Sequence, residues 1–221
     1  MYRQLLVTGA VVLVVFTPPA GAAPRTSCRL VIDAERDVRD STGRTDVRSP
    51  ASLDLTSADI SSDLTHVTGT IRVRDLSAWR EEGTGIGFEF KFTVGKVRYM
   101  YEARTSYARE GIDPLREQGS VVAHDFFLLR QTGGTVDREY WRYLRAIPGY
   151  FDEDSSEIVM TATLADLGMT ARTRATATDL RSSSRTYKDA LVVQGMHSVD
   201  DATSDKSYPM RTPSCAPVFH G

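Results

Sequence analysis

Apolar and polar residues alternate with a period of two in several parts of the chain, and this pattern predicts strands. The clearest case is a hairpin of two strands over residues 88–94 and 97–103, with a turn at Gly95. Its apolar positions are Phe88, Phe90, Phe92, Val94, Val97, Tyr99, Tyr101 and Ala103. Because successive side chains of a strand point to opposite faces, we expect these residues to share one buried face.

Weaker alternation predicts further strands, which cover residues 29–33, 52–60, 65–76, 120–130, 157–164 and 174–185. Residues 52–60 and 65–76 are expected to pair as a second hairpin. Residues 174–185 hold few large apolar side chains and are expected to form an edge strand, and residues 138–146 fit either a strand or a short helix. Since no long segment has a helical period, the chain is predicted to be all-β, with one domain over residues 23–221: a single antiparallel β-sandwich of jelly-roll-like type.

Residues 1–22 have the three parts of a secretory signal peptide. A positive charge at Arg3 precedes an apolar stretch at residues 5–16, and small residues follow up to Ala22. The apolar stretch is shorter than the roughly 20 residues that span a bilayer, which favours a cleaved signal over a membrane anchor. The mature chain, beginning at Ala23, is therefore predicted to be secreted, with no membrane span after signal removal.

The chain has two cysteines, Cys28 and Cys215, near the two ends of the predicted mature protein. In an exported protein, two cysteines and no third favour a disulfide. Such a bridge would bring the two Cα atoms to within about 7 Å of each other, so the termini would be joined. The alternative is a lipid-modified Cys28, although Arg25 and the distance from the apolar stretch disfavour it.

The charge balance limits the choice of partner. Lys and Arg number 27 against 29 for Asp and Glu, which gives a formal net charge of −2. A nearly neutral chain without a Lys/Arg block argues against a nucleic-acid partner. The chain contains no Asn, which excludes N-linked glycosylation.

Two groups of acidic residues offer oxygen ligands of the kind that calcium prefers. Asp37, Asp40 and Asp46, together with Asp33, lie in a polar segment that is expected to be a loop, and they are the predicted metal ligands. Arginines interleave with these acids, so a solvated loop is the alternative. The second group consists of Asp200, Asp201 and Asp205.

An aromatic stretch is the candidate for ligand binding. Tyr140, Trp141 and Tyr143, with Arg142 between them, lie between a Gly-Gly pair and a Pro-Gly break. Exposed aromatic rings stack on the apolar faces of sugars, and Arg donates hydrogen bonds to hydroxyl or carboxylate groups. The alternative is that these rings belong to the core.

No motif for nucleophilic, metal-dependent or nucleotide chemistry is present. Residues 83–87 contain three glycines, but they precede a predicted strand instead of opening a helix, so a flexible turn is expected there. Paired carboxylates for glycoside hydrolysis have candidates in the acidic residues, Glu81, Glu82, Asp152, Glu153 and Asp154. A secreted hydrolase with a site assembled from distant loops therefore stays open as the alternative function.

The run of residues 53–60 and 64–76, with the later segments 149–152, 158–160 and 164–168, resembles secreted β-sandwich modules of the DOMON-like group, which includes the family-9 carbohydrate-binding modules. The resemblance spans roughly residues 30–205. It implies a module that binds sugars, haem or calcium. The predicted function is thus a secreted, non-catalytic binding or envelope-associated module, with a carbohydrate or another cell-envelope component as partner.

Overall fold

The computed structural model describes residues 28–34, 37–38, 51–78, 84–107, 122–135, 138–170, 172–188 and 197–211. Within these ranges the chain forms strands, turns and one short 3₁₀ helix, and it has no α-helix. The elements are β1 (Val31–Ile32), β2 (Leu55–Ser62), β3 (His66–Val73), η1 (Leu76–Ala78), β4 (Thr84–Val94), β5 (Val97–Tyr107), β6 (Val122–Thr135), β7 (Arg138–Ala146), β8 (Gly149–Asp152), β9 (Glu157–Thr163), β10 (Thr176–Lys188), β11 (His197–Ser204) and β12 (Tyr208–Pro209).

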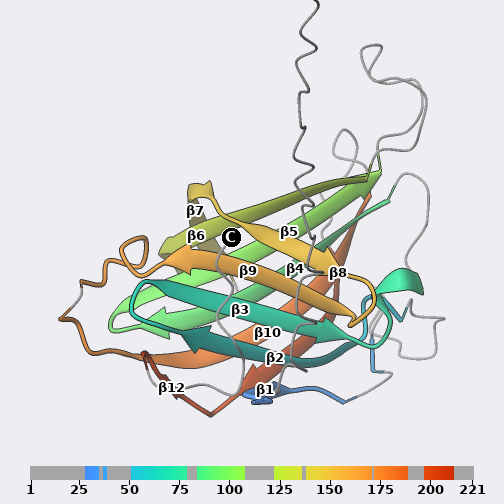
Figure 1. Ribbon diagram of the computed structural model, residues 1–221. Coiled ribbons are helices and arrows are strands. Elements are labelled where there is room, and N and C mark those ends of the chain that lie inside the picture. Colours follow the sequence, from blue (N-terminus) through green and yellow to red (C-terminus); the bar gives the residue numbers. More distant parts are fainter. Residues whose placement is uncertain are drawn as a thin grey trace, which may run out of the picture.

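The strands form two antiparallel sheets, which confirms the prediction of an all-β fold. The five-stranded sheet has the order β1-β2-β3-β9-β8, and the seven-stranded sheet has the order β11-β10-β4-β5-β6-β7, with β12 paired to β10. Figure 1 shows β2, β3 and β9 as a layer in front of β4 and β5. Both predicted hairpins are present, as β2–β3 and as β4–β5.

A single hydrophobic core joins the inner faces of the two sheets. The alternation on β4 and β5 accounts for much of it, because Phe88, Phe90, Phe92 and Tyr101 are all fully buried. The hydroxyl of Tyr101 donates a hydrogen bond of 2.9 Å to the carbonyl oxygen of Val67 on β3, in the opposite sheet. The predicted buried face of the hairpin is therefore the side that packs on the second sheet.

Two local predictions are wrong, and each error has a physical reason. Residues 174–185 were expected at a sheet edge, but β10 lies inside the sheet between β4 and β11. Small side chains suit that place, because the hydroxyls of Ser182 and Ser184 donate to backbone carbonyls of Glu89 and Leu53. Residues 83–87 were expected to form a flexible turn, yet Gly85 and Gly87 lie within β4, where backbone pairing with β10 holds them.

The predicted signal peptide at residues 1–22 and the second cysteine, Cys215, lie outside the described residues, so the export and the disulfide stay predictions. Among the residues that are described, no helix has the length and the apolar character needed to cross a membrane.

Candidate functional site

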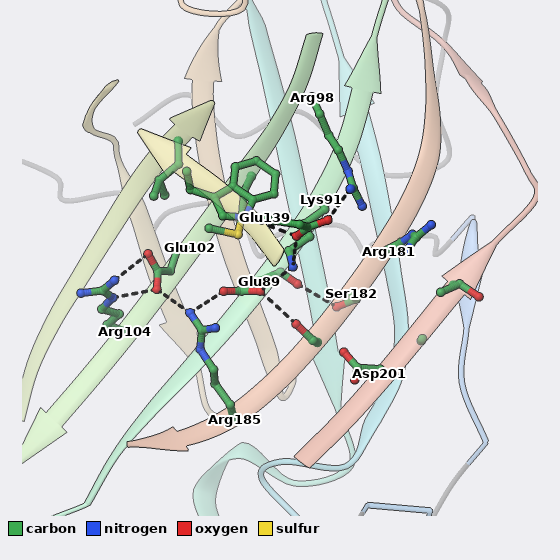
Figure 2. Close-up of a pocket in the computed structure, with 16 residues that line it drawn as sticks. Glu89, Lys91, Arg98, Glu102, Arg104, Glu139, Arg181, Ser182, Arg185 and Asp201 are labelled. Atoms are coloured by element: carbon green, nitrogen blue, oxygen red, sulfur yellow. Dashed lines mark hydrogen bonds and ion pairs between the residues drawn. The ribbon is translucent and has the colours of Figure 1, made fainter. Parts of the chain in front are cut away.

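A pocket of about 590 Å³ lies on the outer face of the seven-stranded sheet, on the side away from the core. Its lining side chains come from β4, β5, β6, β7, β10 and β11 (Figure 2). They are Glu89, Lys91, Arg98, Met100, Glu102, Arg104, Leu129, Glu139, Trp141, Arg181, Ser182, Ser183, Arg185, Asp201, Ala202 and Thr203. Five of these are basic, four are acidic and only a few are apolar, so the pocket is built mainly from charges.

The same alternation that builds the core also builds this pocket. On β4, Phe88, Phe90 and Phe92 face inward, so the residues between them, Glu89 and Lys91, face outward. The neighbouring strands follow the same rule, and register places Glu89 directly opposite Glu102 on β5. The pocket residues are therefore carried by paired backbone in the middle of a sheet, which holds them more rigidly than loops would.

Two glutamates and one arginine form the centre of the pocket. Glu89 and Glu102 are 4% and 1% exposed, and like charges directly opposite each other on a sheet repel. Arg185 on β10 bridges them, because one guanidinium nitrogen contacts Glu89 and lies 2.9 Å from Oε1 of Glu102. Arg104 binds both oxygens of Glu102, at 2.8 and 2.9 Å, and Lys91 lies 3.1 Å from Glu89.

Glu139 on β7 organises the opposite side of the pocket. It contacts Arg98, accepts a hydrogen bond of 3.0 Å from Nζ of Lys91, and accepts one of 3.2 Å from Nε1 of Trp141. Burial alone would raise the pKa of Glu139, but its hydrogen bond and charge pair with Lys91, the charge of Arg98 and the bond from Trp141 together hold that pKa below its usual range. Glu139 is thus an anion that fixes two cations and one aromatic ring.

The Trp141 ring is half-buried and lies outside the hydrophobic core. Nζ of Lys91 lies 5.6 Å from its centroid and the guanidinium carbon of Arg98 lies 5.9 Å from it, within the range of cation–π attraction. The ring is therefore held in place by polar neighbours, and part of it stays open to the pocket.

Some donors of the pocket have no acceptor. Arg98 has a side chain only 15% exposed, yet its Nε and Nη2 atoms are buried without a hydrogen-bond partner. Arg181, which lines the same pocket from β10, takes part in none of the ion pairs of the described residues, and Figure 2 shows it apart from the dashed contacts. The pocket thus combines an ion-pair network with guanidinium groups, those of Arg98 and Arg181, whose donors are not all paired within the described residues.

The predicted ligand-binding residues of the aromatic stretch, 140–143, are divided between the two faces of β7, because successive side chains of a strand point to opposite faces. Trp141 and Tyr143 lie on the outer face, where Trp141 lines the pocket and the ring of Tyr143 meets Phe127 edge-on at 5.7 Å. Tyr140 and Arg142 point to the opposite side of the strand, where both are exposed. Of the four candidates, the structure brings only Trp141 into the charged pocket.

A second group of ionisable side chains lies where β1 meets β11. Asp33 follows β1, Asp37 lies in the segment of the chain that connects β1 to β2, and Asp200 lies on β11. Each of the three offers a carboxylate oxygen, and these oxygens lie within 4.8 Å of one another. Oδ2 of Asp200 accepts the backbone N–H of Leu55 at 2.8 Å, while Oδ2 of Asp33 and Oδ1 of Asp37 are buried without partners. Two residues of the first acidic group, Asp33 and Asp37, are thus joined by one residue of the second group, Asp200.

The remaining predicted ligands, Asp40 and Asp46, lie outside the described residues, so calcium binding by Asp37, Asp40 and Asp46 stays a prediction. Burial, with repulsion from Asp33 and Asp37, raises the pKa of Asp200 to about 8, although the N–H of Leu55 acts in the opposite sense. Burial and repulsion from Asp37 also raise the pKa of Asp33 to about 6. The cluster therefore binds protons near neutral pH.

In the presence of a chelator, the protein should lose stability as the pH rises from about 4 to about 8. In this window the folded state keeps protons on Asp33 and Asp200 that the unfolded chain, with an ordinary aspartate pKa near 3.8, has already released. The free energy of unfolding then falls by up to about 1.4 kcal/mol per pH unit for each such proton. Urea denaturation across this range measures the slope.

Asp200→Asn should flatten that slope, because its amide oxygen can still accept the N–H of Leu55 but the side chain no longer titrates. Asp205→Asn, in the exposed turn after β11, is the matched control and should leave the slope unchanged. If calcium binds here, it competes with protons, so added calcium should raise the melting temperature more at pH 8 than at pH 5. A slope that Asp200→Asn leaves intact would contradict the assignment.

The candidate carboxylates for hydrolysis that the structure describes, Asp152, Glu153 and Asp154, do not line the charged pocket. Glu81 and Glu82 lie outside the described residues. Asp152 ends β8, and Glu153 and Asp154 lie in the turn before β9, where Oδ1 of Asp152 accepts the N–H of Ser155 at 3.2 Å. The pocket has its own facing pair, Glu89 and Glu102, but Arg185 binds both, and this occupies oxygens that an acid or nucleophile would need.

Most residues of the pocket were not candidates in the sequence. The missed ones with charge are Glu89, Lys91, Arg98, Glu102, Arg104, Glu139, Arg181 and Arg185. Several of them occupy the polar positions that alternate with core residues, and such positions ordinarily face solvent. The sequence does contain a signal for this pocket, because the outward positions of these strands carry many charges of both signs. A strand face that is only exposed to solvent does not require such a mixture.

Comparison of the chain with protein-family models, with curated proteins and with solved structures finds no match. The resemblance to DOMON-like modules therefore stays a prediction.

Proposed function

We propose that this chain is an exported, non-catalytic binding module that holds a carbohydrate in the charged pocket on the outer face of its seven-stranded sheet. The observation that carries the proposal is the placement of Trp141: its ring is anchored by Glu139 at 3.2 Å and lies beside a pocket of about 590 Å³ lined by fixed polar groups. An aromatic face surrounded by donors and acceptors suits a sugar, which has apolar faces and polar edges.

The ion-pair network supports binding because it orients the polar groups before a ligand arrives. Glu89 accepts a hydrogen bond of 3.2 Å from the hydroxyl of Ser183 in addition to its contacts with Lys91 and Arg185. A site whose side chains are already held loses less conformational entropy when a ligand binds. The hydroxyls of a sugar can then exchange hydrogen bonds with carboxylates and guanidinium groups that do not need to reorganise.

Replacing Trp141 with Ala should abolish carbohydrate binding, because a stacked aromatic anchor contributes a large share of the binding energy of such a site. The melting temperature should change little, since Trp141 is not part of the hydrophobic core. A glycan array on the mature protein identifies the ligand, and isothermal titration calorimetry measures the loss.

Tyr140→Ala is the matched control for this experiment. Tyr140 is adjacent in sequence, 56% exposed and on the opposite face of β7, so its loss should leave binding unchanged. Equal losses from the two substitutions, or a glycan array with no signal, would reject the pocket as a carbohydrate site.

We also propose that the two sheets form a β-sandwich. It is supported by their shared core and by the way the chain crosses between them. β3 and β9 are neighbours in one sheet, and the strands that follow them, β4 and β10, are neighbours in the other. Such interlocked crossings are typical of Greek-key sandwiches, to which jelly rolls belong.

The proposed Cys28–Cys215 disulfide draws support from contacts near the two ends of the described chain. The hydroxyl of Ser204 donates to the carbonyl of Leu30, and Nζ of Lys206 donates to that of Arg29 at 2.9 Å. The segment after β11 therefore runs beside the residues that follow Cys28. Thiol titration of the unfolded, unreduced exported protein should find no free thiol, and two reactive thiols would exclude the bridge. Mass spectrometry of the same protein should find its N-terminus near Ala23, as expected if the signal peptide is removed.

A further inference from the structure

The geometry points to an acidic saccharide, one that carries carboxylate groups, as the ligand of the charged pocket. This inference rests on the proposed carbohydrate function and adds the chemical class of the sugar. It follows from the balance of charges in the pocket and from the donors that the ion pairs leave unused.

Each glutamate of the pocket is already neutralised. Glu89 contacts Lys91 and Arg185, and the same arginine also contacts Glu102. Arg104 adds a second partner to Glu102, and Glu139 contacts both Lys91 and Arg98. The acids of the network are therefore satisfied by cations, whereas the cations are not all satisfied by acids.

The unused donors belong to Arg98 and Arg181. One nitrogen of Arg98 donates a hydrogen bond to Glu139, and its Nε and Nη2 atoms are buried without an acceptor. A buried, charged donor without a partner is costly, so the pocket favours a ligand that supplies an acceptor near Arg98. Arg181 lines the pocket from β10 and has no ion-pair partner among the described residues.

A carboxylate fits these donors better than a hydroxyl does. The guanidinium group presents parallel N–H donors that match the two oxygens of a carboxylate, and such charge-assisted bonds are about twice as strong as neutral ones. The pocket also has one more basic than acidic side chain among its lining residues, so an anion meets net attraction. Trp141 adds an apolar surface for the sugar ring, which a simple inorganic anion would not use.

The test compares oligogalacturonate with its methyl ester, two probes that share one sugar skeleton and differ in charge. Calorimetry on the mature protein should show the acid binding at least about tenfold more tightly than the ester, with the preference declining at high salt. Arg181→Gln should weaken binding of the acid about tenfold and leave the ester unchanged. Arg142→Gln, on the opposite face of β7, is the control and should have no effect.

The outcomes separate this inference from the proposed function. If acid and ester bind equally and Trp141→Ala abolishes both, the carbohydrate function stands and the acidic class is wrong. If neither probe nor any sugar of a glycan array binds, both fail. If polyglutamate or sulfate binds as tightly as oligogalacturonate, the pocket is an anion site that does not select a saccharide, and the inference is overturned. Thermal unfolding of each variant shows that it is folded.

Discussion

Replacing Arg185 with Met should destabilise the protein by about 3 kcal/mol, because two buried carboxylates would lose the cation that they share. Glu89 and Glu102 face each other in register across β4 and β5 and are almost fully buried. The Arg185 side chain, 16% exposed, contacts both. Without it, Lys91 and Arg104 each keep one carboxylate paired, but the repulsion between the two is no longer offset. Denaturant unfolding at neutral pH measures the loss.

A further measurement identifies the mechanism of that loss. Adding Glu89→Gln and Glu102→Gln to Arg185→Met should recover part of the stability, because the repulsion is then removed with the cation. A triple variant that recovers no stability would show that Arg185 acts by packing alone.

Gly69→Ala should cost about 3 kcal/mol, because the two sheets approach each other closely at this residue. A Cβ at Gly69 on β3 would lie 2.6 Å from Cδ2 of Tyr101 and 3.1 Å from Cδ1 of Phe90. The Tyr101 ring is fully buried, and its hydrogen bond to Val67 in the opposite sheet resists a shift. The free energy of unfolding, obtained from denaturant titration, measures the cost.

Gly133→Ala is the matched control, since Gly133 also lies in a strand but an added Cβ there would have no atom within 4 Å. That substitution should change the free energy of unfolding by less than about 0.5 kcal/mol. Combining Gly69→Ala with Tyr101→Leu should cost less than the sum of the single changes, because the smaller side chain makes room for the methyl group. If the effects of the two substitutions are fully additive, the cost of Gly69→Ala does not come from the contact with Tyr101.

Local patterns were enough to predict the strands that carry the core. The alternation of Phe88, Phe90 and Phe92 determines which face of β4 is apolar, and a turn at Gly95 determines its partner. Both properties depend only on the geometry of a strand and the solvation of side chains, so they can be read without knowledge of neighbours. The absence of a helical period was likewise enough to predict the all-β class.

The position of a strand within its sheet was decided by tertiary structure. The small side chains of β10 suggested an edge, but the strand lies between β4 and β11, where buried Ser182 and Ser184 find carbonyl acceptors in other strands. Whether a buried hydroxyl is costly or harmless depends on such acceptors. They come from residues distant in sequence, so no local pattern contains them.

The candidate site was also decided by tertiary structure. Alternation shows that Glu89 and Glu102 face away from the core, but only the strand order places Arg185 between them and Trp141 at the side of the same pocket. In the same way, the contact between β1 and β11, which belong to different sheets, brings Asp33 close to Asp200. Alternation along the sequence is enough to show which side chains are polar and which face of each strand they occupy. Which charges meet was decided by the fold, because attraction between charges depends on distance in space and on burial, and neither can be read from distance along the chain.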